Sequence, residues 1–324
     1  MYPLNRNRRL RVNETLRGLI RETVITPNDF LVPLFVIEGQ NKKEEIQSMP
    51  NYFKMSIDVL LKEVETLYSL GLKSVLLFAQ VDEKLKDNYG SEAINKDGLM
   101  QRAIKSIKDK YPSLLVMSDV ALDPYSSNGH DGVVENGLIV NDITNDVLSK
   151  MSLTHIEAGA DFVAPSDMMD GRVKAIRTLF EKEGYHNAGI MSYSAKYASC
   201  FYGPFRDALD SKPGFGDKKT YQMDIGNRNE AMNEVKLDIQ EGADIVMIKP
   251  GISYLDIIRD IKNNFNIPIS AYQVSGEYAM IKSAAKNGWL NEDQAILETS
   301  IAFKRAGANF IASYFAKDVV KLIS

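Results

Sequence analysis

The sequence is poor in cysteine, histidine and tryptophan, with one cysteine, three histidines and one tryptophan among 324 residues. The single cysteine, Cys200, excludes a disulfide within the chain and any zinc site built from several thiolates. No run of about 18 apolar residues occurs, and no apolar segment follows the basic N-terminal residues, so no membrane-spanning helix and no secretory signal are expected. We therefore expect a cytoplasmic protein.

Neither sign of charge dominates the chain. It has 39 basic and 43 acidic residues, and no long basic run or basic-aromatic stripe appears beyond the first dozen residues. This distribution argues against nucleic acid as a main partner. Hydrophobic residues make up 44% and charged residues 25%, as in an ordinary globular protein with a large core. The length is compatible with two domains or with one α/β barrel and an extension.

Eight short apolar runs alternate with stretches of helical pattern. The runs begin near residues 31, 74, 114, 161, 188, 244, 268 and 309. Continuous apolar runs predict strands that are buried on both faces, as in a parallel sheet covered by helices. Eight such units predict an α/β fold of the (β/α)8 type, the TIM barrel. We assign residues 31–324 to the barrel and residues 1–30 to an N-terminal arm.

Glycines end several of the predicted helices. The segment from Ser56 to Gly71 has a helical apolar face, and Gly71 is placed to terminate it. Three predicted strands follow turns of similar sequence, EAGAD, EGAD and RAGAN, in which the glycine could supply a left-handed C-cap. This similarity is weak internal repetition, and reuse of one turn chemistry explains it equally well.

The arm and two long connections stand out from the regular pattern. The arm carries Arg8, Arg9, Arg11, Arg17 and Arg21, and it could be a solvated leader or a segment that packs on a neighbouring subunit. The connections run over about residues 123–145, after the third strand, and 200–228, after the fifth. Both follow the C-terminal ends of strands, where barrels carry their active sites and long loops often form lids.

Two lysines end the fifth and sixth predicted strands. Lys196 closes the run MSYSAK and Lys249 closes VMIK, so both would lie at one mouth of a barrel. Burial and a second nearby cation both disfavour protonation, so one or both amines could be neutral at physiological pH. A neutral lysine can form a Schiff base with a ketone. The plainer alternative is a side chain that extends to solvent or pairs with an acid.

Acidic side chains follow the neighbouring strands. Asp119, Asp123 and Asp131 lie in or after the third strand, with His130 beside them, and Ser166 begins the polar segment SDMMDGR after the fourth. Carboxylates at this density can bind a hard cation or take up protons. An Asx-rich turn, a helix cap or a loop salt bridge are the structural alternatives.

Hydroxyl and basic side chains complete the predicted mouth. Ser275 and Tyr314 follow the seventh and eighth strands, where hydroxyls could hold a substrate carboxylate. Residues 201–222, in the second of these connections, include Arg206 and Lys218 together with three glycines and two prolines. A basic lid of this kind suits a small anionic substrate, although a solvated flexible loop would have the same composition.

The motifs MSYSAKYAS, YGPFR, VMIKPG, YQVSGE and DVALDPY with GHDG together resemble the porphobilinogen synthase family, also called 5-aminolevulinate dehydratase. The resemblance extends from RNRRLR to SYFAKD, nearly the whole chain. It implies a TIM barrel with an N-terminal arm, commonly assembled into homo-octamers. The implied activity is a lyase reaction that condenses two molecules of 5-aminolevulinate to porphobilinogen, with loss of two waters, in tetrapyrrole (heme) biosynthesis.

The resemblance also implies roles for individual residues. Lys249 would form a Schiff base with the first substrate, at the P site, and Lys196 with the second, at the A site. The matching positions imply that the remaining substrate contacts divide into three groups: Ser275 and Tyr314 on the P-site carboxylate, Arg206, Lys218 and Gln222 on the A-site carboxylate, and Asp119 and Ser166 beside the A-site substrate.

The metal site departs from the zinc-dependent members of the family, which carry three cysteines in a C-x-C-x7-C pattern. Those positions here read Ala121, Asp123 and Asp131, so the resemblance is to the aspartate-rich type, with magnesium or a monovalent cation as the expected activator. Glu234 matches a second, allosteric magnesium position and Arg11 matches the arm arginine beside it. The alternative for Glu234 is a surface helix charge.

Two other function classes remain open at this point. A class I aldolase also uses a strand-end lysine, but it should show a phosphate-binding turn after the seventh and eighth strands, where the sequence offers one glycine in SGEYAM. A non-enzymatic scaffold fits poorly with a complete pair of lysines and both sets of carboxylate-binding residues.

Overall fold

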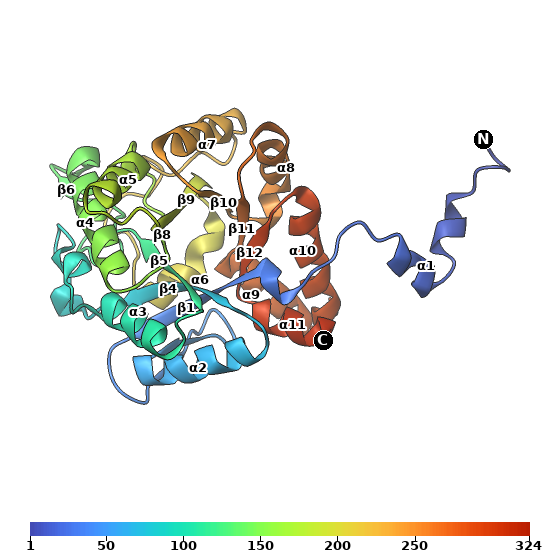
Figure 1. The fold of residues 1–324 in the computed structure, drawn as a ribbon, viewed down its shortest axis with the longest axis horizontal. Helices are drawn as coiled ribbons and strands as arrows, with labels where there is room; N and C mark the ends of the chain where they lie inside the picture. Colours follow the sequence, from blue (N-terminus) through green and yellow to red (C-terminus); the bar gives the residue numbers. More distant parts are fainter.

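A computed structural model describes residues 1–324 and contains a closed barrel of eight parallel strands (Figure 1). The barrel strands, in their order around the barrel, are β1 (Phe30–Ile37), β4 (Ser74–Gln80), β5 (Leu115–Val120), β8 (Phe162–Pro165), β9 (Gly189–Lys196), β10 (Ile245–Lys249), β11 (Ile269–Gln273) and β12 (Phe310–Ser313). Pairing of Phe30 with Ile311 joins β1 to β12 and closes the barrel. All eight predicted strands are confirmed, and so is the (β/α)8 fold.

Helices surround the barrel and cover its strands (Figure 1). They are α2 (Ile57–Ser69), α3 (Leu99–Lys110), α4 (Asn141–Glu157), α5 (Arg172–Lys182), α7 (Asn229–Glu241), α8 (Leu255–Asn264), α9 (Ser275–Lys286), α10 (Glu292–Ala306) and α11 (Ala316–Ile323). The predicted helix from Ser56 to Gly71 is confirmed: Ser56 is the N-cap of α2, and Gly71 adopts a φ of 84° after its end. None of the helices is long and apolar enough to span a membrane.

Short elements lie in the connections. The hairpin β2 (Lys43–Glu45) and β3 (Phe53–Met55) lies beside the end of β1, and β6 (Val134–Glu135) pairs with β7 (Leu138–Ile139) in the connection after β5. The connection after β9 contains the 3-10 helix η5 (Cys200–Tyr202) and α6 (Gly203–Leu209). We call residues 200–228 the lid segment. The remaining 3-10 helices are η1 (Asn7–Arg11), η2 (Pro27–Asp29), η3 (Glu83–Leu85), η4 (Ser91–Ile94) and η6 (Ile252–Tyr254).

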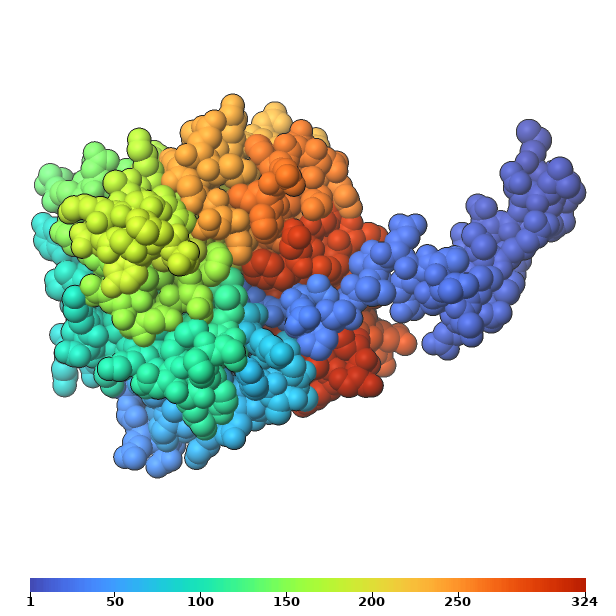
Figure 2. All heavy atoms as spheres, viewed as in Figure 1, coloured from blue at the N-terminus to red at the C-terminus, as the bar shows by residue number.

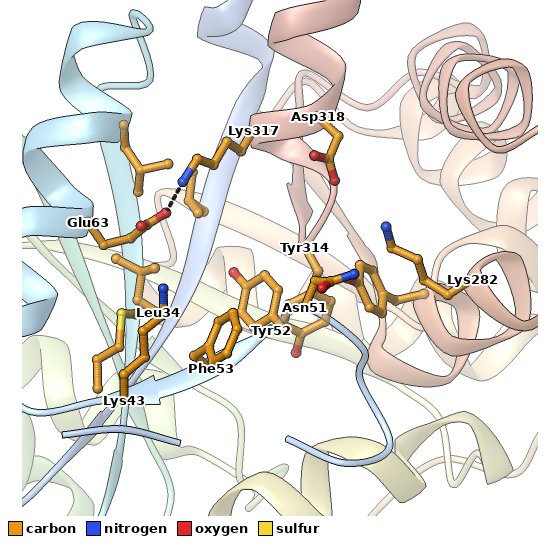
Figure 3. A pocket seen from close by; sticks show the side chains of 14 residues that line it. Leu34, Lys43, Asn51, Tyr52, Phe53, Glu63, Lys282, Tyr314, Lys317 and Asp318 are labelled. Carbon is orange, nitrogen blue, oxygen red and sulfur yellow. Dashed lines mark hydrogen bonds and ion pairs between the residues drawn. The ribbon is translucent and has the colours of Figure 1, made fainter. Parts of the chain in front are cut away.

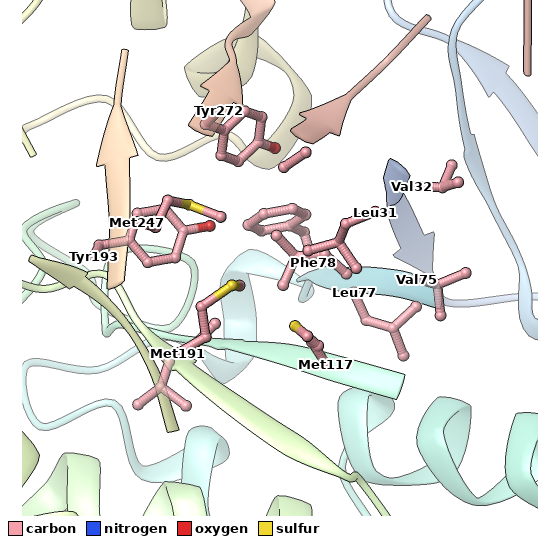
Figure 4. Close-up of a cluster of buried hydrophobic side chains, with 14 of the residues drawn as sticks. Leu31, Val32, Val75, Leu77, Phe78, Met117, Met191, Tyr193, Met247 and Tyr272 are labelled. Carbon is pink, nitrogen blue, oxygen red and sulfur yellow. The ribbon is translucent and has the colours of Figure 1, made fainter. Parts of the chain in front are cut away.

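Large apolar side chains fill the inside of the barrel. Figure 4 shows Met117, Met191 and Met247 from three strands meeting Phe78 and Tyr272, and all five side chains are almost fully buried. A filled interior prevents passage through the barrel, so a ligand can only bind at one of its ends.

The three similar turns have the same geometry. Gly159, Gly242 and Gly307 have φ values of 106°, 105° and 124°, in the positive range that favours glycine. The residue two positions later then accepts a hydrogen bond from the preceding strand in each case. Asp161 accepts from Val116 N at 2.8 Å, Asp244 from Ile190 N at 2.8 Å and Asn309 from Ile269 N at 3.0 Å. The predicted glycine caps are thus confirmed, and the following polar residue ties each new strand to its neighbour.

The N-terminal residues extend away from the barrel (Figures 1 and 2). They contain η1 and the six-residue helix α1 (Glu14–Leu19), neither of which has a buried residue. At the base of this segment Lys304 Nζ pairs with Asp29 Oδ1 at 2.7 Å. The first strand begins at Phe30, one residue before the predicted boundary.

Candidate active site

Lys196 and Lys249 lie side by side at the C-terminal ends of two neighbouring strands. They are partners in the β9–β10 ladder, and both are buried. Between them the register shifts, because Val246 pairs with Ser192 whereas Ile248 pairs with Ala195. The extra residue in β9 is a bulge, and it reverses the face on which the following side chains lie. Without it, Lys196 would point away from the barrel mouth.

Aromatic rings surround the amine of Lys249. Its Nζ lies 4.7 to 5.2 Å from the ring centres of Phe205, Tyr272, Tyr202 and Tyr193. Burial, reinforced by the charge of Lys196, lowers the pKa of Lys249 to about 7. A substantial fraction of its amine is therefore neutral near neutral pH, as a Schiff-base nucleophile requires.

Lys196 lies instead within a network of charges. Its Nζ donates to Asp131 Oδ2 at 3.1 Å and to the carbonyl oxygen of Ser166. Lys218 reaches from the lid segment and contacts Asp131 Oδ1 at 2.5 Å and Asp123 Oδ2 at 3.2 Å. Burial alone would raise the pKa of Asp131, but Lys196 and Lys218 outweigh it and lower that pKa to about 2. Asp131 is therefore an anion that orients Lys196.

Asp119 has the opposite character. Burial raises its pKa to about 7, and the charge of Asp123 adds to the effect. Its Oδ1 is buried and makes no hydrogen bond. A carboxyl group with this pKa, close to the two lysines, can exchange protons near neutral pH.

The lid segment closes over the connection that follows β5. His130 contacts the Tyr221 hydroxyl through Nδ1 and the Phe215 carbonyl oxygen through Nε2, each at 3.0 Å. Gly214 N also donates to Asn128 O at 2.9 Å. His130 and Tyr221 thus hold the lid, a role that the sequence did not reveal, because these contacts join residues about 90 positions apart.

The predicted carboxylate-binding residues have different surroundings. Gln222 is buried and its Oε1 has no partner, whereas Arg206 is partly exposed on α6. Ser275 Oγ accepts a hydrogen bond from Phe205 N at 3.0 Å. The hydroxyls of Tyr314 and Tyr272 are 2.9 Å apart. The structure therefore brings the predicted P-site hydroxyls to the same end of the barrel as Lys249.

A separate cavity of about 280 Å³ lies behind Tyr314 (Figure 3). Tyr52 and Lys282 line it, and an ion pair between Lys317 and Glu63 closes one side. Tyr314 lines this cavity, but neither Lys196 nor Lys249 does.

Glu234 lines a cleft of about 850 Å³ between the lid segment and the β6–β7 hairpin, and Gln222 lines the same cleft. Burial raises the pKa of Glu234. Asp238, one turn later on α7, is buried and pairs with Arg172 at 3.3 Å. Asp238 is therefore a buried, paired charge and not a surface one.

No group of three or more His, Cys, Asp or Glu side chains is arranged to hold a metal ion. Ala121, Asp123 and Asp131 occupy the positions of the zinc-binding cysteines, and Cys200 is exposed on the lid segment. The two ammonium groups of Lys196 and Lys218 already offset the charges of Asp123 and Asp131. A divalent cation there would have to displace Lys218, so this donor set fits one poorly. Glu234, which borders an open cleft, fits a magnesium ion held by one carboxylate and waters.

Comparison with known proteins agrees with this geometry. A model of the delta-aminolevulinic acid dehydratase family matches residues 4–322. The chain belongs to this family. The delta-aminolevulinic acid dehydratase of Bacillus subtilis is 47% identical over 320 residues, covering 99% of this chain and 98% of that protein. That of Methanothermus sociabilis is 51% identical over 322 residues, with 99% of each covered.

A solved structure of the delta-aminolevulinic acid dehydratase (porphobilinogen synthase) from Toxoplasma gondii, in complex with the reaction product porphobilinogen, has the same fold. Its TM-score is 0.96 at 49% identity, and the match covers 98% of this chain and 91% of that chain. The barrel with its lysine pair is therefore the dehydratase fold over nearly its full length.

Proposed function

We propose that this chain is a lyase that condenses two molecules of 5-aminolevulinate to porphobilinogen in tetrapyrrole biosynthesis. The observation that carries the proposal is the pair of buried lysines in register at the barrel mouth, one of them with a pKa lowered to about 7. Two ketone substrates need two amines, and this site holds both. Membership of the dehydratase family supports the same reaction.

Each lysine serves one substrate in this proposal. The neutral amine of Lys249 adds to the ketone of the first molecule, and loss of water gives the Schiff base. Lys196 forms the second Schiff base, at the A site, in the same way after its ammonium group has lost a proton. Asp131 holds Lys196 in place, and Asp119 can accept or return a proton. Fixing both molecules makes bond formation between them effectively unimolecular.

In this proposal, separate sets of residues bind the carboxylates of the two substrates. Ser275 and Tyr314 bind the P-site carboxylate. Arg206, Lys218 and Gln222 bind the A-site carboxylate beneath the lid segment, and Ser166 contacts the A-site substrate. The side-chain amide of Gln222 makes no hydrogen bond within the protein, so its Nε2 is free to donate to a substrate carboxylate.

The aldolase alternative conflicts with the ends of the last two strands. A phosphate there would need free backbone N–H groups. Val274 N after β11 donates to Glu277 Oε2 at 2.9 Å, and Phe315 N after β12 donates to Ser313 Oγ at 3.0 Å. These amides are occupied, and the Glu277 carboxyl group disfavours an anion.

We propose that the activator is magnesium at Glu234, with Arg11 from the arm of a second copy beside it. Bound magnesium would supply positive charge at a subunit boundary. A cation between Asp123 and Asp131 would have to be monovalent and to share the site with Lys218. Residues 1–30 then serve as an assembly arm on a barrel of residues 31–324, and a homo-octamer in the cytoplasm is the proposed form.

The direct test is product formation by the metal-stripped protein supplied with 5-aminolevulinate, with magnesium or zinc added back. We expect porphobilinogen, more of it with magnesium and no increase with zinc. Lys249→Ala should abolish turnover and Lys196→Ala should nearly abolish it. Lys219→Ala is the matched control, since Lys219 is an exposed lysine of the lid segment. Full turnover by Lys249→Ala would exclude the proposed reaction, and indifference to magnesium would exclude the role of Glu234.

A further inference from the structure

Glu277 is a buried carboxyl group that the proposed reaction does not use. It lies in the first turn of α9 with about 1% of its surface exposed. Burying a carboxylate is costly unless several hydrogen bonds compensate for lost water. An exposed Asn, Ser or Asp could cap this helix without that cost, as Asn291 caps α10. The burial of Glu277 therefore calls for a second role.

The two oxygens of Glu277 bind two different turns. Oε2 accepts from Val274 N at 2.9 Å, the ordinary contact of a third-position glutamate with the cap of its own helix. Oε1 accepts from Ile252 N at 2.7 Å, in the turn that follows β10. Capping explains the first contact only. The second crosses to the strand that ends with Lys249.

The turns that Glu277 joins carry two proposed P-site residues. Ile252 lies three residues after Lys249, and Val274 directly precedes Ser275. The turn after β10 also lies tightly on β11, because a Cβ on Gly251 would be 2.7 Å from Tyr272 O and 2.3 Å from the Phe303 ring. No side chain can be inserted there, so the two turns lie in close contact where Glu277 joins their backbones.

We propose that Glu277 is a positioning residue, which fixes the amine of Lys249 relative to the hydroxyl of Ser275 by binding the backbone of both turns. The inference rests on the proposed function, in which Lys249 bonds the ketone of the P-site substrate and Ser275 binds its carboxylate. One short substrate, with only two methylenes between its ketone and its carboxylate, cannot reach both groups unless the two turns keep a suitable separation. Burial raises the pKa of Glu277 to about 8, and the backbone N–H groups oppose that rise.

Two substitutions separate the contacts. Glu277→Gln keeps the shape but has one acceptor oxygen, so it can bind only one of the two amides. Glu277→Asp keeps the carboxyl group and, being shorter by one methylene, retains the local cap but not the reach to Ile252. Asn291→Ala is the control, since it removes the cap of α10, where Asn291 Oδ1 accepts from Gln294 N at 2.9 Å.

The experiment measures kcat, KM and borohydride trapping of 5-aminolevulinate, with the modified lysine identified by mass spectrometry. Both Glu277 variants should lose about 10- to 100-fold in kcat and trap less adduct at Lys249 than at Lys196. In a profile of kcat against pH, the acid limb of both variants should move to higher pH. A displaced Lys249 is better hydrated, and hydration of its ammonium form raises its pKa. Asn291→Ala should change none of these.

A folded Glu277→Gln or Glu277→Asp protein with unchanged kcat and unchanged trapping at Lys249 would overturn the inference. Circular dichroism establishes folding, and if one variant fails to fold, the other decides. Absence of any adduct at Lys249 in the unsubstituted protein would instead overturn the proposed function. The two failures are therefore distinguishable.

Discussion

The pKa of Lys249 should set the acid limb of the reaction. Its charged form predominates below a pKa of about 7 and cannot attack a ketone. We therefore expect kcat/KM to rise with pH through about 7, whereas an ordinary lysine, with a pKa near 10.4, would place the limb more than three units higher. A profile of kcat/KM against pH measures this directly.

Substitution of an aromatic ring near Lys249 tests whether burial by these rings lowers its pKa. Phe205→Ser removes a ring 4.7 Å from Nζ and admits water, so the acid limb should move to higher pH. Phe215→Ser removes a ring that packs on His130 instead and should leave the limb in place. Equal profiles for the two variants would show that burial by the rings does not set this pKa.

Single residues also show what the sequence could and could not predict. Lys196 and Lys249 could be identified because each ends an apolar run, a feature local to the chain. The residues that bind Lys196 could not be identified in this way. Asp131 lies 65 residues away, and Lys218 meets Asp131 across 87 residues. Such contacts depend on how two long connections fold, which no local pattern specifies.

At the level of secondary structure, the bulge in β9 decides what Lys196 faces. Strand residues alternate between faces, so a count along MSYSAK would place Lys196 on the face opposite Met191 and Tyr193, which lie inside the barrel (Figure 4). The extra residue between Ser192 and Ala195 restores it to the inner face. The sequence predicts the strand but not the bulge, since nothing in SYSA marks an insertion.

The lid segment rests on a glycine of the connection after β5. Gly129 has a φ of 64°, and a Cβ there would lie 2.1 Å from Lys212 O. Gly129→Ala should therefore displace the lid segment, and with it Lys218 and Gln222, from the site, and we expect kcat/KM to fall by about 10- to 100-fold. Steady-state kinetics with 5-aminolevulinate measures this loss.

Gly137→Ala separates collision from backbone strain. Gly137 has a φ of 77° in the same connection, but a Cβ there meets nothing within 4 Å. We expect this variant to lose some stability and to keep its kcat/KM. Equal losses of kcat/KM in both variants would attribute the effect to strain, not to the lid.

A buried ion pair joins α5, α7 and β9. Arg172 binds both oxygens of Asp238 at 3.3 Å and the Tyr193 carbonyl oxygen at 3.2 Å. Arg172→Met leaves Asp238 buried and uncompensated, so we expect a loss of about 3–5 kcal/mol in the free energy of unfolding, measured with urea. The pair of Arg228 and Asp260, whose side chains are 63% and 21% exposed, is the control, and Arg228→Met should change the stability little. Similar losses in both variants would contradict the difference in burial.

For the molecule as a whole, repetition explains why the fold was predictable. In three turns a left-handed glycine is followed by a polar residue that binds the previous strand, at Asp161, Asp244 and Asn309. A few adjacent residues thus both end a helix and attach the next strand to its neighbour, so this step of the fold is encoded locally. The position of residues 1–29 has no such local code, because few contacts tie this segment to its own barrel.

The arm therefore needs another surface to stabilise it. A helix of six residues is unstable alone in water, and α1 has Leu19 82% exposed with Val12 69% exposed just before it. Deleting residues 1–20 should produce a smaller assembly than the full chain, measured by light scattering after size exclusion. The deletion stops short of Asp29, whose pairing with Lys304 belongs to the barrel, so the melting temperature of the barrel itself should change little. The double substitution Val12→Asp with Leu19→Asp should have the same effect as the deletion if apolar contacts hold the arm. An unchanged mass for both proteins would place the assembly contacts on the barrel and leave the arm without that role.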